Sequence, residues 1–119
     1  MNKLVTLSLV ISCMVVDPVA AQTYQVHGAG AKSCGLWSEY RNQRSPLAGV
    51  METWVQGYLS AFNALSAVNG HGADLAAGTD DDGVFRWIDN YCATHPLDPL
   101  SSAAAELIAE LDRRAAARP

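Results

Sequence analysis

Positive charge, cysteine and recognisable catalytic motifs are all scarce in this 119-residue sequence. Eight Lys and Arg stand against 12 Asp and Glu, which gives a net charge of −4, and no basic stripe occurs beyond a short Arg-rich tail. Nucleic acid and anionic membranes are therefore poor candidates for a partner. The sequence has no Gly-x-Ser-x-Gly, no His-Glu-x-x-His and no phosphate-binding glycine loop. We therefore expect a binding protein rather than an enzyme.

The first 21 residues have the pattern of a Sec-type export signal. Lys3 supplies the positive charge, residues 4–16 form the apolar stretch, and Val19-Ala20-Ala21 supplies the small residues that a signal peptidase requires. We expect cleavage after Ala21 and a periplasmic or secreted protein. The apolar stretch is shorter than the roughly 20 residues that cross a bilayer. An uncleaved anchor and lipidation at Cys13 are the alternatives.

Export to an oxidising compartment predicts how the cysteines pair. Cys13 leaves with the export signal, so the mature chain keeps Cys34 and Cys92. In a small exported domain an even number of cysteines predicts a disulfide, and two cysteines allow one pairing. Closing that loop of about 59 residues should stabilise the fold by roughly 4 kcal/mol, because the cross-link lowers the entropy of the unfolded chain.

Two segments follow the signal. Residues 22–33 lack hydrophobic periodicity and are rich in Gly and Ala, which predicts a flexible N-terminal arm with a solvated His27. Residues 34–116 contain four stretches with helical periodicity and nothing that predicts a strand. The predicted fold class is all-α: a small bundle of about four helices whose first and third members are joined by a Cys34–Cys92 disulfide.

Capping signals delimit the four helices. The first should run from Cys34 to about Gln43. The second begins after Ser45, with Pro46 at its first position, and ends at Asn69-Gly70. The third opens at the aspartates 80–82 and stops before Pro96. The fourth begins at Asp98-Pro99. The connection 70–79 should be flexible, with one turn near residues 74–77.

The second helix has the strongest apolar pattern, with spacings of three and four over about six turns, which predicts one broad stripe. The stripe consists of Leu47, Val50, Met51, Trp54, Val55, Tyr58, Leu59, Phe62 and Leu65. Gly57 interrupts it, and we expect close approach of another helix there, with backbone contact to a ligand as the alternative. On the first helix, Arg41 should face water. The structural core should include Trp37, Trp54, Gly57, Tyr58, Trp87 and Tyr91.

Cys92 and His95 have a spacing that invites a catalytic or metal-binding interpretation. A catalytic cysteine needs a stabilised thiolate, but Cys92 lies near the C-terminal end of its helix, where the dipole opposes negative charge. A metal site needs three or four convergent ligands, and Cys34 and His71 are the remaining candidates. A calcium loop starting at Gly78 would lack a side-chain oxygen at its first position. We expect no catalytic residue, no metal and no cofactor.

The connection 69–79 and the aspartates after it form the candidate partner-binding surface. Loops on a rigid scaffold often carry binding residues, and an acidic patch suits a basic partner. The candidate residues are His71, Asp74, Asp80, Asp81 and Asp82. The alternative is an ordinary solvated loop, with the aspartates serving to cap the helix.

Three short patterns together resemble a broad group of small exported bacterial proteins. They are Cys34-x-x-Trp37, Trp54-x-x-Gly57-Tyr58-Leu59 and Trp87-Ile88-x-x-Tyr91-Cys92 before Pro96. The pattern is similar to the periplasmic acid-stress chaperones HdeA and HdeB and to the Tai-type immunity proteins that protect against type VI secretion toxins. The likeness covers most of the mature chain, from Cys34 to Leu111, and implies a helical fold with one disulfide and a role in protein binding.

The expected function is that of a non-enzymatic exported protein that binds proteins, as a stress chaperone of the HdeA kind does with unfolded clients. An immunity-like inhibitor of a secreted toxin is the alternative, and a small hydrolase is a third. The expected partners are a folded protein, unfolded clients or a second copy of the chain. Protonation of the carboxylates below a pKa near 4 would change the net charge of the mature chain from about −4 to about +10.

Overall fold

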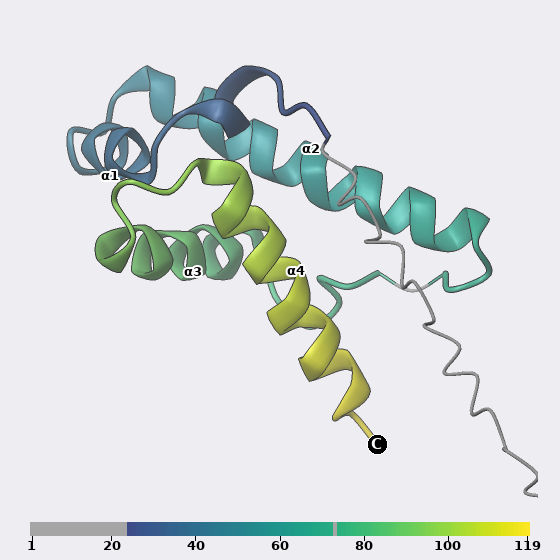
Figure 1. The fold of residues 1–119 in the computed structure, drawn as a ribbon. Coiled ribbons are helices and arrows are strands. Elements are labelled where there is room, and N and C mark those ends of the chain that lie inside the picture. Colours follow the sequence, from purple (N-terminus) through teal and green to yellow (C-terminus); the bar gives the residue numbers. More distant parts are fainter. Residues whose placement is uncertain (1–23, 73) are drawn as a thin grey trace, which may run out of the picture.

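The computed structural model describes residues 24–72 and 74–119, so the predicted export signal and Cys13 lie outside the described residues. A short 3-10 helix, η1 (Gly28–Ala31), precedes four α-helices: α1 (Cys34–Asn42), α2 (Pro46–Val68), α3 (Asp81–Thr94) and α4 (Leu100–Ala116). Figure 1 shows α1 and α3 together at one end, with α2 crossing that end and continuing beyond it. The predicted all-α fold and the Cys34–Cys92 disulfide are confirmed.

Side-chain caps place the helix starts close to the predicted positions. The hydroxyl oxygen of Ser45 accepts a hydrogen bond from the Leu47 N–H, and Pro46 is the first residue of α2. Asp80 caps α3 by accepting from the Gly83 N–H at 2.8 Å. α2 ends at Val68 with Asn69 as its C-cap, and Gly70 follows with a φ of 78°, a left-handed conformation that glycine adopts without steric cost.

The start of α4 differs from the prediction. Pro99 occupies the N-cap position and provides no side-chain cap, while Asp98 accepts a hydrogen bond from the Tyr91 hydroxyl at 2.8 Å. The segment before α4 is instead tied to the start of α1. The Cys34 N–H donates to the Asp98 carbonyl, and the Leu100 N–H donates to the Lys32 carbonyl. Pairing between two segments far apart in the sequence thus replaces a local cap.

The core lies between all four helices and is centred on α4 and the disulfide. Cys34, Trp37, Val55, Ile88, Leu100 and Leu107 are its most deeply buried large side chains, together with Cys92. Phe85, which was not among the predicted core residues, is also buried and lies against Trp37 with ring centroids 6.2 Å apart. Trp54, Tyr58, Trp87 and Tyr91 are partly buried at the edge of this core.

The described part of the predicted flexible arm is packed against α2. Its helix η1 contacts α2 and α4, and the indole N–H of Trp54 donates to the His27 carbonyl at 3.0 Å. Gly30 is buried against the Trp54 ring, where a Cβ atom would overlap the ring. The His27 side chain itself is exposed. The Gly and Ala content that suggests flexibility therefore also allows close contact with a tryptophan.

Gly57 requires a correction, because it lies outside the core. It is exposed, and a Cβ atom added there would meet none of the described residues within 4 Å. No described residue lies close to it, since the buried residues Met51, Val55 and Leu59 are on another side of α2 and η1 packs against Trp54. The glycine therefore has no packing role within the described part of the chain.

Candidate protein-binding surface

The most unusual surface of the molecule is the exposed side of α2. We name it the α2 face and define it by Leu47, Val50, Gly57, Ala61, Leu65 and Val68, all of which are exposed. Val50 is 60% exposed, Leu65 is 61% exposed and Val68 is 84% exposed. The 23 residues of α2 include a single charged residue, Glu52. A helix that borders water normally carries charges on its outer side, so this face is a candidate for binding.

The described residues of the protein bury only part of the predicted apolar stripe on α2. Met51, Val55 and Leu59 of this stripe are buried, whereas Phe62 and Leu65 are exposed. Beyond Leu59 the described contact comes mainly from the loop after α2, where Leu75 is buried and its N–H donates to the Asn63 side chain. Figure 1 shows the C-terminal half of α2 extending away from α1 and α3.

An apolar groove lies at the N-terminal end of the α2 face, where α1 and η1 meet α2. Its volume is about 210 Å³, and Lys32 is the one charged residue among those that line it. The lining residues are Ala29, Lys32, Leu36, Tyr40, Leu47, Val50 and Met51. The groove has room for a side chain of the size of leucine or valine and would place that side chain against Leu47 and Val50 of the α2 face.

The predicted acidic candidates are only partly brought together. Asp74, Asp80 and Asp81 line one open hollow of about 320 Å³ between α2 and the start of α3, and none of its described lining residues is basic. Asp80 caps α3, and Asp74 accepts from the Asn63 amide at 2.9 Å, so two of these carboxylates already have partners in the fold. Asp82 and His71 are exposed and do not line the hollow.

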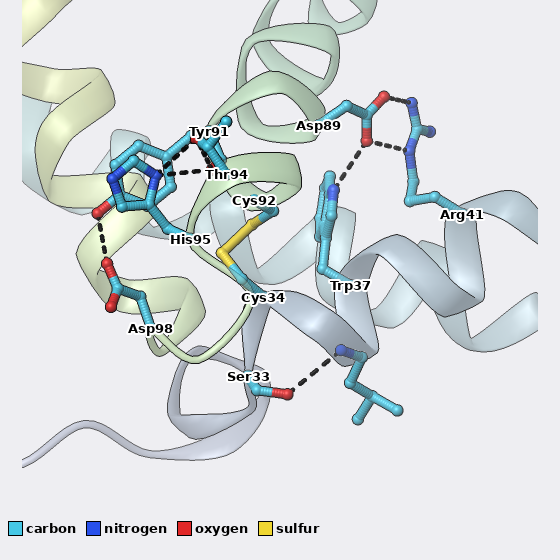
Figure 2. The surroundings of a disulfide bond; sticks show 11 residues. Ser33, Cys34, Trp37, Arg41, Asp89, Tyr91, Cys92, Thr94, His95 and Asp98 are labelled. Atoms are coloured by element: carbon cyan, nitrogen blue, oxygen red, sulfur yellow. Dashed lines mark hydrogen bonds and ion pairs between the residues drawn. A yellow bond between two sulfur atoms is a disulfide. The ribbon is translucent and has the colours of Figure 1, made fainter.

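Cys92 and His95 act separately, as Figure 2 shows. Cys92 is bonded to Cys34, with the two Cα atoms 4.8 Å apart. The Nδ1 atom of His95 lies 2.9 Å from both the Tyr91 carbonyl and the Thr94 hydroxyl, and its ring stacks on Tyr91 with centroids 4.2 Å apart. The histidine is therefore part of the C-terminal end of α3. Among residues 24–72 and 74–119, no three His, Cys, Asp or Glu side chains converge as metal ligands would.

An ion-pair network beside the disulfide was missed by sequence reasoning (Figure 2). Arg41 donates to Asp89 through Nε at 3.0 Å and Nη2 at 2.8 Å, and to Glu52 through Nη1 at 2.6 Å. The hydrogen bond to Asp89 is the main cause that raises the pKa of Arg41 above its usual value. The predicted exposure of Arg41 to water is thus corrected: the residue links α1, α2 and α3.

The Asp89 carboxylate also binds a core residue, because it accepts a hydrogen bond from the indole N–H of Trp37 at 2.8 Å. The predicted Cys34–Cys92 disulfide would have allowed the contact between Trp37 and Asp89 to be predicted from the sequence. Trp37 follows Cys34 by about one turn, and Asp89 precedes Cys92 by about one turn. Two helices joined in an antiparallel arrangement at these cysteines must bring the two residues opposite each other. The adjoining hollow, of about 450 Å³, is lined by Arg41, Asp89 and Cys92, whose polar groups already have partners.

Within the part of the chain that the structure describes, no helix combines the length and the apolar character needed to cross a bilayer. Comparisons of the whole sequence with protein-family models and curated proteins, and of the structure with solved structures, find no match for this chain.

Proposed function

We propose that the chain is a non-enzymatic exported domain that binds unfolded or partly unfolded client proteins through the α2 face. The observation that carries this proposal is the combination of high exposure and absent charge on that face, where Val50, Leu65 and Val68 are all at least 60% exposed. Contact with apolar segments of a client removes apolar surface from water on both sides, which is favourable and needs no specific partner sequence.

The charge of the protein fits such a role under acid stress. Twelve carboxylates outnumber eight Lys and Arg, so protonation below about pH 4 makes the whole chain strongly positive. Repulsion between like charges then loosens the bundle, while the Cys34–Cys92 disulfide limits how far the chain expands. The buried part of the α2 stripe, including Met51 and Val55, would become accessible to clients in the loosened state.

The test is suppression of client aggregation by the purified protein at pH 2–3 and at pH 7. Leu65→Ser lowers the apolar content of the α2 face and should weaken protection severalfold. Leu97→Ser is the matched control, because Leu97 is 92% exposed but lies in the turn between α3 and α4. The proposal is abandoned if the wild-type protein gives no protection at either pH, or if both variants lose protection equally.

The acidic hollow favours a second candidate function, immunity-like binding of a basic toxin at neutral pH. Asp81 lines the hollow and makes no side-chain hydrogen bond to the described residues, so it is available to a cationic partner. In a pull-down from periplasm at pH 7, Asp81→Lys should lose a specific partner that Asp82→Lys retains, since Asp82 does not line the hollow. Retention of the partner by both variants would exclude this site.

A further inference from the structure

We propose that Asn69 is a site of spontaneous deamidation, at which the folded chain slowly replaces the amide at the C-terminal end of α2 by a carboxylate. Asn69 is the C-cap of α2, is exposed and is followed directly by Gly70. The modification needs no client or partner, so it stands apart from the proposed function.

The residue after an asparagine governs how easily its side chain reacts with the backbone. Of the asparagines in the sequence, Asn69 alone is followed by glycine. The residues that follow Asn2, Asn42, Asn63 and Asn90 are Lys3, Gln43, Ala64 and Tyr91. Glycine has no Cβ to hinder the approach of its nitrogen to the preceding side chain, and its backbone angles are the least restricted. The reaction is therefore expected first at residue 69.

The reaction proceeds through a cyclic imide. The backbone nitrogen of Gly70 loses its proton and attacks the side-chain carbonyl carbon of Asn69, a step that is fast only when the two atoms are held close together. A carbon–nitrogen bond forms, the bond to the side-chain amide nitrogen breaks, and ammonia leaves with the proton. Water then adds to one of the two carbonyl groups of the five-membered ring. The products are aspartate and isoaspartate, with one water consumed and one ammonia released.

The C-cap must open before this attack, because both reacting groups are hydrogen-bonded. The Gly70 N–H donates to the Ala67 carbonyl at 3.0 Å, and the Asn69 side-chain amide donates to the Leu65 carbonyl at 3.0 Å. These bonds complete the last turn of α2, as is usual for a helix that ends at a left-handed glycine. Release of the Gly70 nitrogen from Ala67 is therefore the conformational step that precedes the chemistry.

This opening disturbs little of the fold. Residues 67–72 are all exposed, and Val68 is 84% exposed. A Cβ atom added at Gly70 would meet none of the described residues within 4 Å. Helix ends with few buried contacts open locally at a small free-energy cost. The reactive geometry is therefore accessible to the folded protein and does not require global unfolding.

A similar pair at the start of α3 lies in a protected place. Asp82 also precedes a glycine, but Gly83 is partly buried, and its N–H donates to the Asp80 carboxylate at 2.8 Å. The charged acceptor makes this hydrogen bond strong. Val84 and Phe85, which follow directly, are buried in the core. Release of the Gly83 nitrogen would thus disturb both the helix cap and the packing, so the structure should slow cyclisation here.

Deamidation at residue 69 should loosen the last turn of α2. The product loses the amide that donates to Leu65 and places a negative charge beside the helix C-terminus, where the dipole disfavours it. Isoaspartate also adds a methylene group to the main chain. The bond from Gly70 to Ala67 and the bond from His71 to Ser66 then cannot keep their present geometry. The net charge of the chain changes from −4 to −5.

Peptide mass spectrometry of the protein purified from the periplasm and kept for days near neutral pH tests the proposal. Residue 69 should convert at least about tenfold faster than Asn42 and Asn90, which are exposed but precede larger residues. Its rate should lie within about tenfold of the rate in the urea-unfolded chain, since local opening costs little. The rate should also rise with pH, because the attacking nitrogen must lose its proton. Retention of the amide at residue 69, or equal conversion at Asn42 and Asn90, overturns the proposal.

Two variants provide the controls. Asn69→Gln keeps an amide that would have to form a six-membered ring, and it should abolish conversion at this position. Asp82→Asn creates a second asparagine–glycine pair, and conversion there should be at least about fivefold slower than at residue 69, because the Gly83 N–H is held by Asp80. Equal conversion at residues 69 and 82 would overturn the role given to the structure.

Hydrogen exchange measures the consequence for α2. Asn69→Asp reproduces one of the two products, and the amides of Gly70 and His71 should exchange severalfold faster in this variant than in the wild type. The amide of Gly83 should be unchanged, since it lies in another helix. Unchanged exchange at Gly70 and His71 would overturn the loosening of the last turn.

Discussion

The two ends of α2 lie in very different surroundings. Toward its N-terminal end, one side of the helix is covered by other helices, and Glu52 joins the Arg41–Asp89 network beside the disulfide. At its C-terminal end, the helix is covered mainly on one side by the loop that follows it, and Leu65 and Val68 are exposed. Glu52 and the buried residues near the N-terminal end stabilise the fold, whereas Leu47 and Val50 there and Leu65 and Val68 at the C-terminal end remain exposed to a partner. Variants in the two regions should therefore affect different measurements.

Loss of the disulfide should have the largest effect. In the double variant Cys34→Ser, Cys92→Ser, the free energy of unfolding should fall by roughly 4 kcal/mol, because the unfolded chain is no longer closed over a separation of 58 residues. Urea unfolding of both proteins measures the difference. Addition of a reductant should destabilise the wild type by a similar amount and leave the double variant unchanged.

Asp89→Leu should have the next largest effect. It leaves the indole N–H of buried Trp37 without its acceptor and removes the main partner of Arg41, which should lower the free energy of unfolding by about 2–3 kcal/mol. Asp89→Asn keeps an acceptor for Trp37 and should cost less. Urea unfolding compares the two, and an equal loss in both would mean that the charge, rather than the acceptor, stabilises this region.

Gly30→Ala tests the contact between η1 and Trp54. The added Cβ would overlap the Trp54 ring, so either η1 or the ring must move, at a cost of about 1–2 kcal/mol. The fluorescence of Trp54 should change together with the stability. An unchanged midpoint and spectrum would show that residues 24–33 contribute little to the fold.

Tyr91→Phe should have a smaller, pH-dependent effect. The hydrogen bond from the hydroxyl to Asp98, and then burial, raise the pKa of Tyr91 above its usual value. The protonated phenol is the donor, so its stabilisation is complete below about pH 10 and is lost as pH rises through the raised pKa. Tyr91→Phe should lower stability by about 1 kcal/mol at pH 7 and reduce the loss between about pH 9 and 12. Urea unfolding across this range provides the measurement, and Tyr58, whose pKa is also raised by burial, accounts for slope that remains.

Gly57→Ala should have the smallest effect on stability, and with the opposite sign. An alanine in the middle of a helix is more favourable than a glycine by about 0.5–1 kcal/mol, and there is space for its methyl group. Thermal unfolding of dilute protein should therefore show a slightly higher midpoint. A destabilised variant would mean that part of the chain packs on this side of α2.

Prediction of the four helices from sequence succeeded because each start depends on a few adjacent residues, such as Ser45-Pro46 or the aspartates before α3. The start of α4 was less accurate, because Asp98 bonds to Tyr91 rather than to the first turn of its own helix. The Arg41–Asp89 pair and the contact of Gly30 with Trp54 were missed for a related reason. Each joins residues far apart in the sequence, and patterns among neighbouring residues do not predict such contacts.

The sequence by itself determined the all-α class, the helix boundaries to within a few residues and the pairing of Cys34 with Cys92, because capping, periodicity and a cysteine count act locally or leave one choice. It also determined that α2 is apolar along its whole length. Only the tertiary structure decided which part of that stripe is buried and which part, including Leu65 and Val68, remains exposed. Burial depends on the few elements that this small chain can place around α2, and these cover less surface than the helix presents.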